Sequence, residues 1–186
     1  MKRFIIILCA PLLFSLFSFA HREEAVIKQT QEQPQKVEKI VYPPVVKYHP
    51  PAVHFAVALP AVTLILQAFY ILRNRKPDGL EFLFILMTSG AVAGAAVTGY
   101  VAHESIEDIP IRSDALNLLH THETLGIYLA LFFGLIFILR LLYWFKPSGT
   151  LRFLYVLLLL LGSAVVLFQG NLGGKLVYDF GLGVSG

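Results

Sequence analysis

The stretch ALNLLHTHETLGIYLALFFGLIFILRLLYWF, residues 115–145, decides the fold class because it is apolar along nearly its whole length. A helix needs about 20 consecutive apolar residues to cross a bilayer. Three further stretches reach that length, at residues 53–72, 80–102 and 151–169. The connections between them are short, so neighbouring helices should pack antiparallel. The sequence therefore predicts an all-α membrane protein, an up-down four-helix transmembrane bundle.

The composition of the whole chain indicates the same class. Of the 186 residues, 56% are hydrophobic and 15% are charged, a balance typical of membrane proteins. The basic residues are scattered and mostly flank apolar runs, so they give no nucleic-acid-binding signature. The single cysteine, Cys9, lies in the predicted leader. We therefore expect the mature protein to have no disulfide, no thiolate metal site and no C-x-x-C-H haem attachment.

The chain before the first helix divides into two predicted segments. Residues 1–20 have a charged start, an apolar stretch and small residues before the expected cleavage point, which predicts a cleaved signal peptide. The alternative is a retained first span, which leaves the orientation of the rest unchanged. Residues 21–48 are rich in Gln, Glu and Lys without apolar periodicity, so we expect a flexible external linker, with prolines stiffening its end toward polyproline geometry. Residues 49–186 then form the transmembrane domain.

Charge placement predicts the orientation of the bundle. The connections after the first and third helices are basic, with Arg73, Arg75 and Lys76 at the first and Arg140, Lys146 and Arg152 flanking the third. The second holds Glu104, Glu107, Asp108 and Asp114 against Arg112. The positive-inside rule puts the basic connections in the cytoplasm. The linker, the acidic connection and the C-terminus are then expected on the outer, periplasmic side of a bacterial inner membrane. A glycine-rich segment after residue 169 is expected to fold over the outer mouth of the bundle.

Histidines gather at the predicted outer face. Apart from His21 in the linker, they lie at the outer ends of three helices: His49, His54, His103, His120 and His122. Three of these histidines have a small residue one helical turn away on the same face: Ala58 after His54, Gly99 before His103 and Gly126 after His122. Such rows are also the common means by which membrane helices pack without any cofactor. We expect His54, His103 and His122 to converge, and His120, two residues from His122, to point away.

Both ends of this region resemble a known family. Residues 49–55, HPPAVHF, resemble the HPxxVHFP start, and residues 173–184, GGKLVYDFGLGV, resemble the GGxLVYxxGxGV end, of the bacterial membrane family known as domain of unknown function 2231. The similarity covers residues 48–184, and Ala56 departs from the family's usual proline. The resemblance implies a four-helix membrane domain. Because the family is sometimes joined to cytochrome c-like or Rieske-like domains, it also implies electron transfer, without an established activity.

Three functions fit these residues. The first is b-type haem binding for electron transfer, with His54 and His122 as axial ligands, His103 in reserve, Gly99 and Gly126 making room for the ring, and Lys175 reaching a propionate. A quinol or a periplasmic cytochrome would then be the redox partner. The second is an outer-face copper, iron or zinc site at His54, His103 and His122, completed by Glu104 or Glu123. The third is an accessory or scaffold protein with no cofactor.

These three functions share a non-catalytic character. No nucleophile, base and orienting group occur together, so an electron-transfer or accessory protein is favoured over a stand-alone enzyme. Membrane lipids are expected partners, nucleic acid is not, and homo-oligomerisation stays open.

Overall fold

The structure is a computed structural model that describes residues 44–105 and 111–183. The predicted signal peptide and most of the predicted linker lie outside the described residues. A short 3-10 helix, η1 (Pro44–Tyr48), leads into four long helices, α2 (His49–Leu72), α3 (Gly79–Glu104), α4 (Ser113–Phe145) and α5 (Gly149–Tyr178). Each is long and apolar enough to cross a membrane, and the described part of the chain contains no strand. The predicted all-α transmembrane fold is confirmed.

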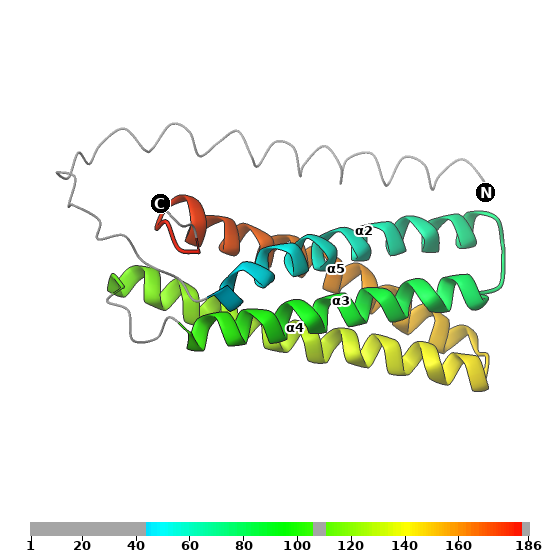
Figure 1. Ribbon diagram of the computed structural model, residues 1–186. Helices are drawn as coiled ribbons and strands as arrows, with labels where there is room; N and C mark the ends of the chain where they lie inside the picture. Colours follow the sequence, from blue (N-terminus) through cyan, green and yellow to red (C-terminus); the bar gives the residue numbers. More distant parts are fainter. Residues whose placement is uncertain (1–43, 106–110, 184–186) are drawn as a thin grey trace, which may run out of the picture. The chain divides into compact units, whose positions relative to one another are not determined.

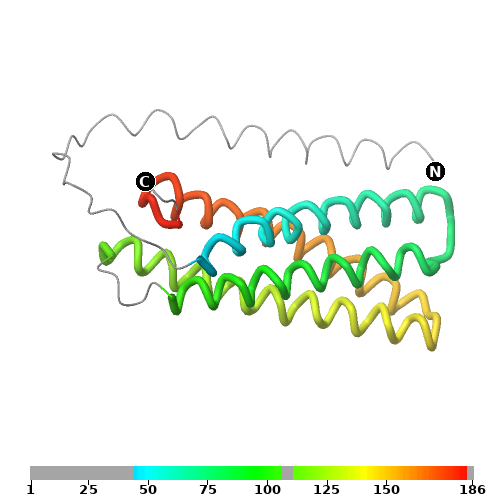
Figure 2. Tube along the Cα trace, viewed as in Figure 1, coloured from blue at the N-terminus to red at the C-terminus, as the bar shows by residue number. Residues whose placement is uncertain are grey.

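The four helices form an up-down bundle in which each helix has two neighbours. Helices α2 and α4 each pack against α3 and α5, and α2 and α4 themselves are diagonal (Figure 1). The N-termini of α2 and α4 and the C-termini of α3 and α5 therefore share one end of the bundle, at the left of Figure 2. We call this the histidine end, because five histidines lie there.

Helix α2 begins earlier than predicted, at His49 rather than at residue 53. Pro50 and Pro51 occupy the first turn, where a backbone N–H has no intrahelical partner and proline fits the helical φ angle. The expected polyproline stiffening is therefore wrong for these residues. This extra turn matters for the site, because it brings His49 into the bundle.

Helix α5 also extends beyond its predicted end at residue 169 and continues to Tyr178. The glycine-rich segment is thus helical as far as Tyr178, which corrects the expected end of the last helix at residue 169. Tertiary packing outweighs the low helix propensity of glycine here. Only the residues after Tyr178 turn back, with Gly181 and Gly183 at φ +68° and +83°, and Leu182 packs beside Ala115 and Leu176.

The core lies along the bundle axis, and the outside is apolar. Ile85, Phe133, Ile136, Tyr155 and Leu159 are almost fully buried. Large apolar side chains are exposed on all four helices, including Phe55, Ile65, Leu83, Leu131 and Phe153. Exposed apolar surface of this extent is what a lipid-facing bundle requires.

Candidate functional site

The histidine end brings four imidazoles together as two pairs. The rings of His49 and His122 have centroids 6.3 Å apart with planes at 80°. The rings of His103 and His120 have centroids 4.9 Å apart with planes at 72°. Each pair joins two helices, the first across the bundle diagonal and the second between neighbours. The pairing differs from the expected convergence of His54, His103 and His122.

Glu123 completes a compact cluster with the second pair. Its carboxylate accepts a hydrogen bond from Nδ1 of His103, a buried residue, while Nε2 of that ring is buried without a hydrogen-bond partner. One ligand atom from each of His103, His120 and Glu123 lies within 4.8 Å of the other two. Two imidazoles and a carboxylate are a ligand set that zinc, iron and copper all accept.

His49 is held by a threonine on the neighbouring helix. Its Nδ1 lies 3.2 Å from Oγ1 of Thr98, and that hydroxyl donates to the carbonyls of Gly94 at 2.9 Å and Ala95 at 3.1 Å. Since a hydroxyl has one proton, Nδ1–H of the neutral imidazole is the donor to Thr98. Nε2 of His49 therefore carries the lone pair. A Cβ at Gly99 would lie 2.9 Å from Cε1 of His49, so glycine is needed for the ring to fit.

The backbone carbonyl of His122 is hydrogen-bonded, but one nitrogen of its ring has no hydrogen-bond partner. The Gln169 side chain donates from Nε2 to the His122 carbonyl oxygen at 2.5 Å. Nδ1 of His122 and Oε1 of Gln169 are both buried without a hydrogen-bond partner. Gly173 lies against the ring, since a Cβ there would be 3.1 Å from Cε1 of His122. Buried polar atoms are normally paired, so two unpaired atoms on adjacent residues point to a missing ligand or water.

A cavity of 460 Å³ lies between these groups. Its polar lining includes His49, His103, His122, Glu123 and Gln169, and most of the remaining walls are aliphatic side chains and glycines. An apolar cavity with a few convergent polar groups is the usual form of a small-molecule site. The volume is within the range of such sites.

The other residues named from sequence lie as follows. His54 is exposed, and its Nδ1 donates to the Pro50 carbonyl oxygen at 2.8 Å, although its side chain also borders the cavity. Gly99 and Gly126 line the cavity. Lys175 is partly buried in the last turn of α5 and does not line it. Glu104 is exposed and accepts from the Tyr100 hydroxyl instead of a histidine.

The sequence places His49 at the outer end of the first helix but does not select it as a ligand, because the small residue Ala58, one turn after His54, favours His54. The spacing of seven from His49 to Ala56, Thr63 and Tyr70, all three buried, places it on the interior face of α2. His54, two residues before Ala56, falls on the other side. The sequence contained this signal, but it becomes readable only when Pro50 and Pro51 are placed inside the helix. Nothing in the local sequence singled out Gln169 or Thr98.

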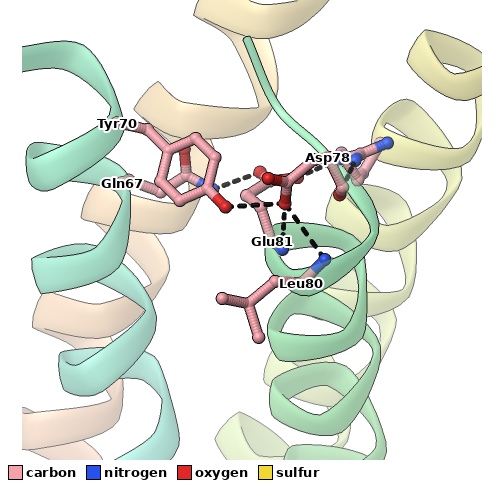
Figure 3. Close-up of polar contacts among 6 residues, drawn as sticks. Gln67, Tyr70, Asp78, Leu80 and Glu81 are labelled. Atoms are coloured by element: carbon pink, nitrogen blue, oxygen red, sulfur yellow. Dashed lines mark hydrogen bonds and ion pairs between the residues drawn. The ribbon is translucent and has the colours of Figure 1, made fainter. Parts of the chain in front are cut away.

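A second buried polar cluster, which sequence reasoning missed, lies near the opposite end of the bundle. Glu81 and Arg140 are fully buried and form an ion pair. Gln67 donates its side-chain N–H to the same Glu81 carboxylate (Figure 3). Arg140 also donates to the backbone oxygen of Asp78 at 3.0 Å. The hydroxyl of Tyr70 donates to Asp78 at 2.6 Å and holds the pKa of that carboxyl below its usual range. Arg140 was read only as a cytoplasmic flanking charge.

Comparison with known proteins gives one match. A family model described as a predicted membrane protein (DUF2231) matches residues 46–186. No curated protein and no solved structure matches the chain.

Proposed function

We propose that this chain, which belongs to the DUF2231 family of predicted membrane proteins, binds a first-row transition-metal ion at His103, His120 and Glu123. The observation that carries the proposal is the grouping of three ligand atoms within 4.8 Å of one another. Metal–nitrogen and metal–oxygen bonds of about 2.0–2.2 Å put tetrahedral ligands roughly 3.5 Å apart. Side-chain rotations on the order of 1 Å therefore close the shell around an ion.

The surroundings of the cluster support a metal more than a purely structural contact. Nε2 of His103 is buried and unpaired, whereas a ring that served only as a helix contact would be expected to satisfy both nitrogens. Binding of an ion would replace the hydrogen bond between Glu123 and Nδ1 of His103 by a bond from each residue to the metal. Ionisable groups within membrane helices are in any case functional candidates. Three protein ligands leave one coordination position for water or another small ligand.

Titration of the detergent-purified chain with Co²⁺ and Zn²⁺ tests this proposal. The d–d spectrum of bound Co²⁺ reports coordination directly, and Zn²⁺ competition gives the affinity. The His120→Ala variant should lose high-affinity binding, because it removes one of three ligands from an exposed position where the fold does not depend on it. The matched control is His54→Ala, another exposed histidine at the same end. Equal affinities for wild type and His120→Ala would refute the site.

A b-type haem is the second candidate, and one observation favours it. His49 and His122 come from diagonal helices and face each other at the cavity, and Thr98 orients His49 so that Nε2 carries the lone pair. The pair His54 and His122 chosen from sequence is replaced, because His54 is exposed and bonded to its own helix. Two imidazoles from facing helices suit a low-spin electron-carrying centre, with a quinol or a periplasmic cytochrome as partner.

The lining of the cavity counts against haem. None of the described residues that line it is Lys or Arg, so the two propionates would have no cationic partner there. Absorbance spectra of the protein produced with ample haem separate the candidates. A low-spin band that is lost in His49→Ala and retained in His54→Ala would establish haem, and absence of any band leaves the metal site as the function.

The outer, periplasmic side is our proposal for the location of the histidine end. The connections at the opposite end carry Arg73, Arg75, Lys76, Lys146 and Arg152, which favours the cytoplasm for that end. The metal would then be exchanged with the external compartment and not with the cytosol.

A further inference from the structure

The cavity at the histidine end has features that a bound metal ion does not explain. It extends over 460 Å³ and is walled mainly by aliphatic side chains and glycines of all four helices. A metal ion occupies a small fraction of that volume. His120, one of the three proposed metal ligands, does not line the cavity. The cavity is therefore a site in its own right that adjoins the metal cluster at His103 and Glu123.

The charge of the lining defines what the cavity can hold. Among the described lining residues there is no Lys or Arg, and the one acid, Glu123, accepts the hydrogen bond from His103. An anionic ligand such as a phosphate or a carboxylate would lose its hydration without a cation to replace it. A permanent cation would find a single carboxylate already engaged. The ligand that fits is neutral and largely apolar.

The polar end of the cavity specifies a hydroxyl group. Oε1 of Gln169 can only accept a hydrogen bond, and it is buried without a partner. The amide N–H of the same side chain already donates to the His122 carbonyl oxygen. Nδ1 of His122, on the residue that Gln169 holds, is also buried without a partner. The lone pair on Nε2 of His49 is a further acceptor. A ligand that donates a hydrogen bond is required to satisfy Oε1 of Gln169.

We propose that this cavity binds a neutral, membrane-soluble phenol or hydroquinone, with its hydroxyl donating to Oε1 of Gln169 and its ring lying in the cavity beside the imidazoles of His49 and His122. Gly99 and Gly173 let these two imidazoles lie close against the helix backbone. His103, nine-tenths buried with Nε2 unpaired, offers a second polar contact on the same wall.

The probe for this site is tetramethylhydroquinone, and its dimethyl ether is the matched compound that cannot donate. Binding is measured by calorimetry under anaerobic conditions, with the full chain in lipid nanodiscs and empty nanodiscs as the blank for partitioning. We expect saturable binding of the hydroquinone and at least about tenfold weaker binding of the ether, the effect of one lost hydrogen bond in a buried site.

Two variants and one control locate the binding. Gln169→Leu should weaken hydroquinone binding about tenfold while leaving Co²⁺ affinity unchanged, which also shows that the variant is folded. Ala96→Leu fills the cavity and should abolish binding with the Gln169 amide intact. Asn171→Leu, an exposed amide on the same helix, should have no effect.

Several outcomes overturn the proposal. Equal binding of the hydroquinone and its ether, or unchanged binding in both Gln169→Leu and Ala96→Leu, would show that the ligand does not occupy this cavity. Absence of saturable binding by wild type would do the same. Loss of Co²⁺ binding in His120→Ala with hydroquinone binding retained is the expected separation of the two sites, so either can fail alone.

Discussion

His103 in the last turn of α3 and Glu123 in α4 form a hydrogen bond between side chains that are largely withdrawn from solvent, 9% and 17% exposed. The hydrogen bond joins the ends of two neighbouring helices through Nδ1 of His103. The other ring nitrogen, Nε2, is buried without a hydrogen-bond partner. Both residues are ligands in the proposed metal centre, and this bond holds them close together before an ion binds. The relationship is therefore the structural basis of the proposed metal centre.

The first prediction concerns this carboxylate. Glu123→Gln should lower metal affinity by at least about tenfold, because it removes the one anionic ligand of the three. Glu104→Gln is the control, since Glu104 is exposed and bonded to Tyr100. Competition against a chromophoric chelator measures both. Equal affinities in the two variants would assign Glu123 a purely structural role.

The second prediction tests the fit of His49 against α3. Gly99→Ala places a methyl group 2.9 Å from Cε1 of His49 and should cost about 1–3 kcal/mol of stability by overpacking. Gly94→Ala, on the same helix with nothing within 4 Å of its Cβ, should be neutral or slightly stabilising. Thermal denaturation in detergent compares the two. A stable Gly99→Ala protein would mean that His49 does not occupy this position.

The third prediction concerns the buried pair of Glu81 and Arg140. Arg140→Met leaves the Glu81 charge buried without its partner and should destabilise the bundle by about 3–5 kcal/mol, whereas the double variant Arg140→Met with Glu81→Leu should recover most of that loss. Arg75→Met, at an exposed ion pair with Asp78, should change stability by less than about 1 kcal/mol. Unfolding in mixed SDS micelles measures all three. If the stability loss of the double variant equalled the sum of the losses of the two single variants, Glu81 and Arg140 would not be energetically coupled.

The fourth prediction concerns topology. A periplasmic alkaline phosphatase fused after Gly186 should be active, and a reporter that works only in the cytoplasm should be inactive there, because the basic connections belong to the opposite end. The reverse pattern would move the histidine end to the cytoplasm. The metal and hydroquinone proposals would then concern cytoplasmic ligands.

The fold was predictable from sequence because apolar length is the dominant constraint on a membrane helix. The ends of the helices were less predictable. The glycines from Gly170 to Gly174 predict a break, yet α5 passes through them. Gly170 packs on α2 and Gly173 packs on α4, against His122. Packing partners from other helices cannot be seen in the local sequence.

The site was predictable in part. The gathering of histidines at one end follows from helix direction alone, but the choice between His49 and His54 required the helix start and its phase. Glu123 was named as a completing ligand, yet its bond to His103 depends on how α3 and α4 are rotated against each other. The same rotation joins Glu81 to Arg140, a pair that lies 59 residues apart in sequence.

X-ray absorption spectroscopy of the purified, zinc-loaded chain tests the metal centre most directly. The account predicts one ion per chain, with two imidazole ligands and metal–nitrogen and metal–oxygen distances of about 2.0–2.2 Å, and in His120→Ala less bound zinc with at most one imidazole ligand. Zinc coordinated without imidazole, or the same spectrum from wild type and His120→Ala, would contradict it.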